Sequence, residues 1–344
     1  MGNDDQLRGR VVVVTGSSAG VGRAAAQAFG RAGAQVALLA REPEALEEAR
    51  AEIESAGARA LGLAVDVADG PAVFEAAERI ERELGPIDVW VNNAMLTVYA
   101  PVAEMTPEEF RRVTETTYLG FVHGTMAALK AMRPRRAGTI IQVGSSLSYR
   151  GIPLQAAYCG AKHAIRGFTD ALRAELIHEG SPIALVMVQL PAVNTPQFDW
   201  ARAHLAHAPR PVPPVFQPEV AARAILTAAR IPSREYWLGL STAKVIFGSM
   251  AFPGFLDRYL ARRAYRAEER HRPLWPDRPD NLEAPVRGLH RTRGSFGQEA
   301  RTSALLLSDL QARLAVVGLG AILYALLARP ARREDRLAPG KGRR

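Results

Sequence analysis

The sequence predicts an α/β fold in which a doubly wound, mainly parallel sheet of seven strands carries helices on both faces. Two patterns in the first 240 residues predict it. Apolar runs of strand length recur along the chain, and amphipathic patterns of helical period separate most of them. The runs are almost continuously apolar rather than alternating, which is typical of parallel strands buried on both faces. A helical extension is expected after residue 240.

Each run has the length of a strand, and one domain is enough to hold all seven. Right-handed crossovers between parallel strands place helices on both faces of the sheet and a ligand at the carboxyl ends of the strands. The expected strands are RVVVVTG (10–16), QVALLA (35–40), ALGLAVDV (60–67), IDVWVNNA (87–94), TIIQVGSS (139–146), IALVMVQL (183–190) and EYWLGL (235–240).

The turn after the first expected strand, TGSSAGVG (15–22), is rich in glycine. Its glycines are Gly16, Gly20 and Gly22. Glycine allows a tight turn and a close approach of the backbone to a pyrophosphate, and the free N–H groups at the start of the following helix attract the anion. A dinucleotide cofactor is therefore expected at this turn.

The end of the second strand distinguishes NAD from NADP. NAD sites usually offer a carboxylate there to the ribose 2′-hydroxyl, whereas this chain has Ala40 followed by Arg41. A guanidinium can pair with the 2′-phosphate of NADP, which a carboxylate would repel. NADP(H) is therefore favoured over NAD(H), and the alternative is that Arg41 is an ordinary surface residue.

Tyr158 and Lys162, in YCGAK, begin a helical pattern just after the fifth expected strand. Four residues are about one helical turn, so both side chains leave the same face. An isolated pair of this kind is more typical of a surface lysine beside a packed tyrosine. The alternative is a catalytic pair, because a phenol is a poor base at neutral pH and a nearby cation favours its ionised form.

Taken in chain order, these motifs resemble those of the short-chain dehydrogenase/reductase family. The glycine-rich turn is followed by Asp66 and Val67, by NNA (92–94), by a serine at the end of the fifth strand and by YCGAK. The resemblance covers about residues 8–240. It implies a single-domain Rossmann-like fold, an NAD(P)(H) cofactor, and a Tyr–Lys–Ser group that interconverts a carbonyl and an alcohol.

The resemblance implies roles for individual residues. Tyr158 matches the general acid/base, and Lys162 matches the residue that contacts the nicotinamide ribose and favours the tyrosinate. Ser145 would hydrogen-bond the substrate oxygen, with Ser146 as the alternative. Besides Tyr158, Lys162 and Arg41, the residues implied in cofactor binding are Gly16, Ser18, Gly20, Val21, Gly22, Asp66, Val67, Asn93, Ala94, Val193 and Thr195.

Three positions depart from the family pattern. Met95 and Ala192 replace glycines near the cofactor, and Thr117 stands where the family has a catalytic asparagine. Threonine offers a hydroxyl but cannot present a carbonyl oxygen and an amide together. Thr117 is included in the expected catalytic group, and the second hypothesis is a catalytically weakened NADP-binding scaffold or a membrane-associated interaction protein.

The loop after the sixth strand, residues 194–219, is long and rich in proline. The resemblance places substrate recognition in this loop and in the C-terminal part of the chain. Its apolar residues could form a lid over an apolar substrate, or they could pack on the domain surface. A lipophilic carbonyl or alcohol compound is the expected substrate. The apolar residues are Phe198, Trp200, Leu205, Val212 and Phe216.

The net charge of +9 is concentrated near the C-terminus. Residues 241–344 carry 20 Lys and Arg against 10 Asp and Glu, and residues 1–240 carry 24 against 25. A neutral main domain argues against nucleic-acid binding. No metal site is expected, because His204 and His207 lack a nearby carboxylate in the sequence and indicate a solvated pair.

Two further features favour a cytoplasmic location. The single cysteine, Cys159, excludes an internal disulfide and suits a reducing compartment. The N-terminus lacks the apolar segment of a secretory signal. The family resemblance alone implies a homo-oligomer, formed through the helices around 107–132 and 158–179.

The extension is expected in three parts: a basic, partly irregular segment (241–300), an apolar helix within 301–330, and a basic tail (331–344). Leu314 to Ala328 are uncharged and mostly apolar, which gives about 22 Å of helix against a bilayer core of ~30 Å. Three alternatives stay open for residues 303–329: a marginal membrane anchor, a helix lying on anionic lipid, and a buried helix that completes the fold or an oligomer.

Overall fold

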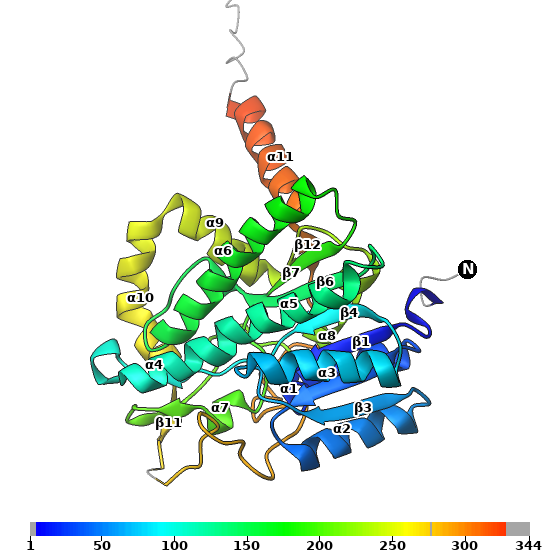
Figure 1. The fold of residues 1–344 in the computed structure, drawn as a ribbon. Coiled ribbons are helices and arrows are strands. Elements are labelled where there is room, and N and C mark those ends of the chain that lie inside the picture. Colours follow the sequence, from blue (N-terminus) through cyan, green and yellow to red (C-terminus); the bar gives the residue numbers. More distant parts are fainter. Residues whose placement is uncertain (1–4, 276, 328–344) are drawn as a thin grey trace, which may run out of the picture.

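The computed structural model describes residues 5–275 and 277–327 (Figure 1). Its main sheet contains all seven predicted strands and one more from the extension, in the order β12-β10-β7-β6-β4-β1-β2-β3. Neighbours pair in parallel, except that β12 pairs antiparallel with β10. The strands are β1 (Val11–Thr15), β2 (Gln35–Ala40), β3 (Ala60–Ala64), β4 (Ile87–Asn92), β6 (Thr139–Ser145), β7 (Ala184–Leu190), β10 (Glu235–Leu238) and β12 (Leu306–Ser308).

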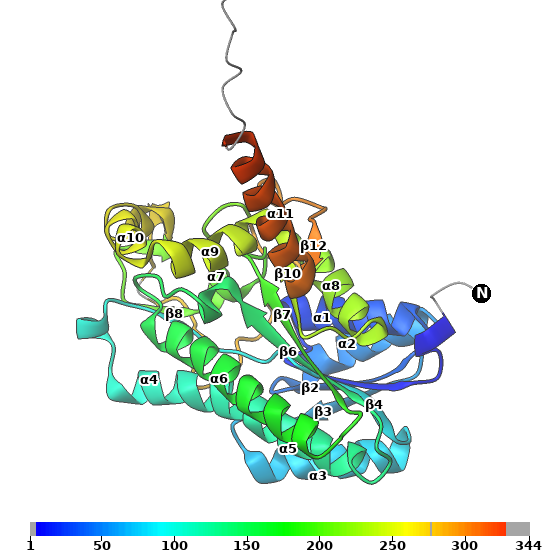
Figure 2. The same cartoon turned by 90° about the horizontal axis from the view of Figure 1, so that it is seen from above.

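Two helix layers cover the sheet, as Figures 1 and 2 show. One core cluster joins the sheet to α1 (Gly20–Arg31), α2 (Pro43–Ser55) and α8 (Pro218–Arg230). The opposite cluster joins it to α3 (Gly70–Glu83), α5 (Gly120–Met132) and α6 (Ala156–His178). The predicted doubly wound α/β architecture is confirmed.

Strand β1 shows why its sequence is an unbroken apolar run. Val12 and Val14 belong to the core under α1 and α8, whereas Val11 and Val13 belong to the core under α3 and α5. Successive side chains of a strand point to opposite faces. Because both faces are covered, these four successive positions are all apolar.

Short elements connect the main ones. Helix α4 (Pro107–Thr114) begins with a capping box, in which Thr106 accepts from the N–H of Glu109 and the Glu109 carboxylate accepts from the N–H of Thr106. It continues through a π-helical turn, η3, into α5. The short helical turns are η1 (Asp5–Leu7), η2 (Val102–Glu104), η3 (Glu115–Leu119) and η4 (Ser146–Ser148).

The predicted loop 194–219 contains short regular elements. It forms α7 (Gln197–Trp200), β8 (Arg202–Ala203) and β9 (His207–Pro209), and β8 pairs with β5 (Val98–Tyr99). Most of its large apolar side chains are buried, whereas Val212 is 37% exposed. The loop therefore packs on the domain and also contributes to a cavity wall. The buried side chains are those of Phe198, Trp200 and Phe216.

The extension does not stand apart from the sheet. Helices α9 (Gly239–Ala251) and α10 (Pro253–Ala267) are followed by β11 (Glu269–Pro273), which pairs with β9. Strand β12 then adds to the edge of the main sheet, where it covers β10. The sequence predicted seven strands and a core ending near residue 240. It did not predict this eighth strand, because a strand of three residues is too short to show a periodic hydrophobic pattern.

The apolar helix predicted within 301–330 begins later, as α11 (Asp309–Leu327). Figures 1 and 2 show it extending away from the body of the protein. Among the described helices, none combines the length and apolar character needed to cross a bilayer. Ala328 and the predicted basic tail lie outside the described residues.

Candidate active site

A cavity of about 680 Å³ opens at the carboxyl ends of the parallel strands. This is the edge of a doubly wound sheet where the loops after successive strands meet and leave room for a ligand. Of the residues predicted to form the site, all but Gly22 and Thr117 line this cavity. Those lining it are Gly16, Ser18, Gly20, Val21, Arg41, Asp66, Val67, Asn93, Ala94, Ser145, Ser146, Tyr158, Lys162, Val193 and Thr195.

The loop after β1 is packed against the loop after β4. Gly16 has a φ of +65°, and a Cβ there would lie 2.7 Å from the Cα of Ala94. At Gly22 a Cβ would lie 2.1 Å from the carbonyl oxygen of Gly16. Only glycine permits both contacts, so Gly22 shapes this loop without lining the cavity.

Asn93 holds this loop in place. Its side-chain amide donates to the carbonyl oxygens of Thr15 and Gly16 at 2.9 and 3.3 Å, and its backbone N–H donates to the Thr15 hydroxyl at 2.9 Å. The first turn of α1 then starts at Gly20 with no side-chain cap from Ala19. The N–H of Gly20 donates to the carbonyl of Arg291 at 3.0 Å, and the N–H groups that follow it at this helix start, which have no side-chain cap, are a suitable environment for a phosphate.

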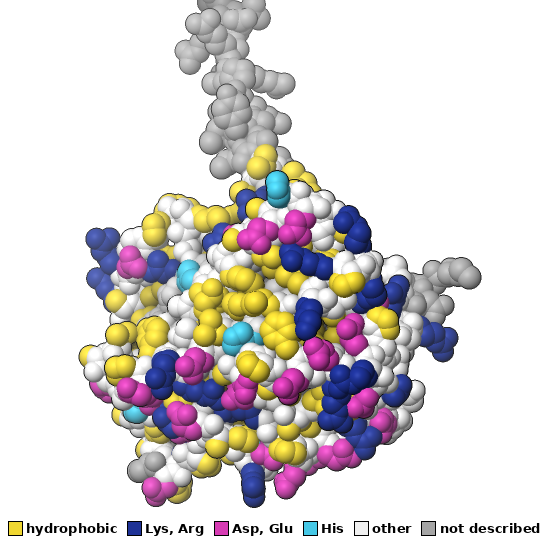
Figure 3. All heavy atoms as spheres, in the orientation of Figure 1, with side chains coloured by type: hydrophobic (Ala, Val, Ile, Leu, Met, Phe, Trp, Pro, Cys, Tyr) yellow, Lys and Arg dark blue, Asp and Glu magenta, His cyan; other side chains and the backbone are white. Residues whose placement is uncertain are grey.

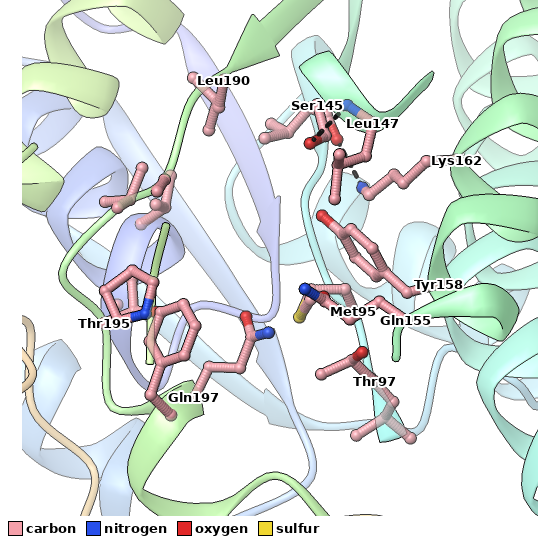
Figure 4. Close-up of a pocket in the computed structure, with 18 of the residues that line it drawn as sticks. Met95, Thr97, Ser145, Leu147, Gln155, Tyr158, Lys162, Leu190, Thr195 and Gln197 are labelled. Atoms are coloured by element: carbon pink, nitrogen blue, oxygen red, sulfur yellow. Dashed lines mark hydrogen bonds between the residues drawn. The ribbon is translucent and has the colours of Figure 1, made fainter. Parts of the chain in front are cut away.

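The predicted catalytic side chains meet at the end of β6 and the start of α6 (Figure 4). The Ser145 hydroxyl accepts from the N–H of Leu147 at 3.1 Å. Lys162 is almost fully buried, and its Nζ donates to the carbonyl oxygen of Val143 at 2.8 Å and lies 5.6 Å from the centre of the Tyr158 ring. Tyr158 and Lys162 leave the same helix face, as their spacing predicted.

Burial controls the protonation of this pair. It raises the pKa of the Tyr158 phenol well above its ordinary value, and a hydrogen bond with Ser145 acts in the opposite direction. Burial lowers the pKa of Lys162 to about 7. Both shifts favour the uncharged forms, as expected for groups withdrawn from water. The resemblance implied that Lys162 favours the tyrosinate, but in this structure burial has the larger effect on Tyr158.

Thr117 does not line the cavity, which corrects its expected place in the catalytic group. It is fully buried in η3, where its hydroxyl donates to the carbonyl of Leu96 and accepts from the N–H of Leu96, both at 2.9 Å. A hydroxyl that both donates to and accepts from one residue ties the loop after β4 to the helix. Its neighbour Thr116 lines the cavity instead.

Arg41 lines the cavity, but its guanidinium contacts the extension. It donates to the carbonyl oxygens of Asn281, Leu282 and Glu283. Burial lowers its pKa from the ordinary value. Arg41 is therefore not an ordinary surface arginine. No local sequence pattern predicted its partners, the backbone carbonyls of residues 281–283.

The other departures from the family pattern also lie at the site. Met95 and Ala192 both line the cavity, and Figure 4 shows the Met95 side chain below Tyr158. A bulky side chain therefore forms part of the wall of this cavity.

Several polar wall residues were not predicted. Figure 4 shows Gln155 and Thr97 near Tyr158, and Gln197 across the cavity from it. Glu268 also lines the cavity; it is fully buried and accepts from the Gln155 amide at 2.9 Å. Burial raises the pKa of Glu268 to about 8. Its sequence context, AEER, is typical of an exposed basic and acidic helix end, so no sequence signal indicated a buried carboxyl.

The two histidines predicted to be solvated each contact a glutamate. His204 lies 2.8 Å from Glu109, and His207 lies 3.3 Å from Glu269. These glutamates are distant in sequence, which is why the sequence showed no carboxylate partner. Within the described ranges, no group of three or more His, Cys, Asp and Glu side chains gathers in an arrangement that could hold a metal.

Known proteins are similar to this chain in sequence and in fold. A family model described as short chain dehydrogenase matches residues 10–205. The uncharacterized oxidoreductase YxnA of Bacillus subtilis (strain 168) is 32% identical over 287 residues, which make up 83% of this chain and 81% of that protein. Several other curated relatives are matched over 54–59% of their own length.

Two solved structures are also similar. A metagenomic short-chain oxidoreductase in complex with NADP has a TM-score of 0.57 and 26% identity, and the match covers 67% of this chain and 96% of that one. An NAD⁺-bound xylitol dehydrogenase has a TM-score of 0.52 and 28% identity, with 55% of this chain and 72% of that one covered.

The buried carboxyl makes a prediction about stability. Glu268 keeps its proton up to about pH 8 in the folded protein, against an ordinary value of 4.5. The unfolded chain releases this proton at lower pH, so the stability contribution is present below pH 4.5 and is lost as the pH rises to about 8. Glu268→Gln removes the titration. Between pH 6 and pH 8, the free energy of unfolding of the wild type should fall by about 2 kcal/mol relative to that of Glu268→Gln.

Urea unfolding of both proteins at the two pH values measures this difference. Parallel pH dependences in the wild type and in Glu268→Gln would show that the carboxyl is solvated in the folded protein.

Proposed function

The chain belongs to the short-chain dehydrogenase family, and on that premise we propose that it is an NADP(H)-dependent carbonyl reductase or alcohol dehydrogenase acting on a lipophilic substrate. The observation that carries the proposal is the meeting of Ser145, Tyr158 and Lys162 in the wall of a cavity that the glycine-rich loop also lines. This arrangement brings a proton donor and a nucleotide-binding loop to one ligand space.

The described residues fit a dinucleotide. Added side-chain atoms at Gly16 or Gly22 would collide with backbone, so the loop leaves space for a closely bound ligand. The nicotinamide, when bound, supplies the hydride that reaches the carbonyl carbon. The residues of this chain must then hold the carbonyl oxygen and give it a proton.

Tyr158 and Ser145 are placed for this task. The Ser145 hydroxyl donates a hydrogen bond to the carbonyl oxygen, and the Tyr158 phenol transfers its proton to the same oxygen as the hydride reaches carbon. The negative charge left on Tyr158 raises the proton affinity of the buried Lys162 amine nearby, so the cationic form of Lys162 stabilises the tyrosinate. The products are an alcohol and the oxidised cofactor.

The preference for NADP(H) rests on the positive charge at the end of β2. One of the similar structures holds NADP and the other holds NAD⁺, so this choice depends on the residues of this chain. Arg41 lies at the cavity, and Arg112 lies close enough to interact with it electrostatically. Two guanidinium groups favour a 2′-phosphate over a free hydroxyl.

The proposal of a lipophilic substrate rests on the apolar part of the cavity wall. This part includes Val212, Val245, Tyr259 and Leu260, whereas Gln155 lies near Tyr158. Such a wall suits a compound with a polar group around the reacting carbon and an apolar remainder.

Association with an anionic membrane surface is part of the proposal. Helix α10 buries only Ala264 and exposes Phe255 and Tyr259 at 66% and 51%. Figure 3 shows basic side chains gathered at the left edge, where α10 lies. Apolar side chains beside arginines suit an anionic lipid surface. Co-sedimentation with phosphatidylserine vesicles, and its absence with neutral phosphatidylcholine vesicles, tests this association.

A homo-oligomer is proposed through the face formed by α4, α5 and α6. Figure 3 shows apolar side chains gathered on this face. Phe110, Leu119 and Met126 are 42%, 37% and 51% exposed there, and exposed apolar patches of this kind are typical of protein interfaces. Measuring the molar mass in solution tests the proposal. The wild type should form an oligomer, and Met126→Glu should dissociate it.

Tyr158→Phe should abolish turnover and leave cofactor binding in place. The phenylalanine ring keeps the packing but has no proton to transfer, and loss of a general acid typically costs about 10²–10⁴-fold in rate. NADPH oxidation over a panel of medium-chain aldehydes and ketones measures the effect. Bound NADPH without turnover in the wild type would instead favour the scaffold hypothesis.

Arg41→Ala should weaken NADPH binding about tenfold or more beyond any loss of NADH binding, because only NADPH carries the phosphate. Fluorescence titration of both cofactors measures the two affinities. Arg31→Ala, at an exposed position at the end of α1, is the matched control and should change neither. Equal losses for both cofactors in Arg41→Ala would contradict the assignment of the phosphate to Arg41.

A further inference from the structure

We propose that residues 281–297, here called the strap, form the outer wall of the dinucleotide site and must open for the cofactor to exchange. This inference rests on the proposed cofactor binding. The strap is an irregular segment of the extension, which the family model does not reach. Figure 1 shows it as an orange coil near α7.

The first part of the strap holds two arginines at the end of the site near β2. Arg41 donates to three successive strap carbonyls, at 3.2 Å for Leu282 and 3.1 Å for Glu283. The Nε of Arg112 donates to the carbonyl of Leu282 at 3.2 Å, while its terminal N–H pairs with Asp66. The strap backbone thereby fixes the direction of the guanidinium groups that are proposed to select the 2′-phosphate.

The middle of the strap lies against the glycine-rich loop. The N–H of Gly20 donates to the carbonyl of Arg291 at 3.0 Å, and Arg23 donates to the carbonyl of His290 at 2.9 Å. The His290 ring lies 3.1 Å from the Ser18 hydroxyl. The strap therefore contacts the same loop that is proposed to hold the pyrophosphate.

The last part of the strap is joined to the loop after β7. Asn194 is fully buried; its backbone carbonyl accepts from the N–H of Gly294 at 3.1 Å, and its side chain accepts from the N–H of Phe296 at 2.9 Å. A Cβ at Gly294 would lie 2.3 Å from the carbonyl oxygen of Thr195. The strap thus crosses the loops after β2, β1 and β7, all of which border the cavity.

Apolar anchors fix both ends. Leu282 is fully buried in a cluster with Leu96 and Val98, and Phe296 packs edge-on against Phe198 with ring centres 5.7 Å apart. Neither Leu282 nor Phe296 lines the cavity. Both can therefore be truncated without removing a group from the cavity wall.

The strap encloses the cavity and does not fill it. Asn281, Pro285, Val286 and His290 line the side of the cavity that faces the glycine-rich loop, and about 680 Å³ remains open within. This volume lies within the range of pockets that bury small-molecule ligands. A dinucleotide in this space would lie between the loop and the strap, so its release requires the strap hydrogen bonds to break.

Leu282→Ala and Phe296→Ala test the proposal at its two anchors. Each deletes buried apolar atoms and should raise the open fraction of the strap. We expect NADPH to dissociate at least about tenfold faster from both variants. Stopped-flow fluorescence with an NADP⁺ chase measures this rate. Leu176→Ala, at a buried leucine near the end of α6, is the matched control and should release NADPH at the wild-type rate.

Amide hydrogen exchange of the full-length protein gives a second measurement. If the strap is a wall, NADPH should slow exchange across residues 281–297 in the wild type. Unchanged release rates with unchanged strap exchange would overturn the proposal and leave the proposed function standing. If NADPH speeds up amide exchange in the strap, or if only the two anchor variants bind NADPH, the strap competes with the cofactor and is not a wall of its site. Absence of binding in every form would overturn both proposals.

Discussion

The site depends on how closely the loop after β1 can approach the loop after β4. The Cα of Ala94 occupies the space that a side chain at Gly16 would need, and Asn93 bonds to two carbonyl oxygens of the β1 loop. This contact sets the start of α1, and with it the direction of the N–H groups at the cavity. The remaining walls of the cavity are built around this pair of loops.

Burial of polar groups is the second constraint on the site. Lys162 and Glu268 are both almost fully withdrawn from water, and burial favours the uncharged form of each. It lowers the pKa of Lys162 to about 7 and raises the pKa of Glu268 to about 8. Groups that titrate near neutral pH respond strongly to a charge brought beside them. A charged ligand bound in this cavity would therefore be expected to shift the protonation of these two groups.

The basic extension uses much of its charge within the molecule. Arg270 and Arg291 both pair with Asp199, at 3.0 and 3.1 Å, and Arg293 pairs with Glu219 at 2.9 Å. Asp199 and Glu219 belong to the main domain, which has no net excess of basic residues. Part of the uneven charge distribution in the sequence is therefore explained by attraction between the extension and the domain it covers.

The sequence by itself determined the seven parallel strands, the glycine-rich loop and the shared helix face of Tyr158 and Lys162, because each depends on a period or a spacing between near neighbours. Tertiary structure alone decided the partners of Arg41, the inward position of Glu268 and the place of the strap. These contacts join residues more than 100 positions apart, and no local pattern records them. Thr117 shows the same limit at short range, since its spacing matched the family while its contact with Leu96 turned its hydroxyl away from the cavity.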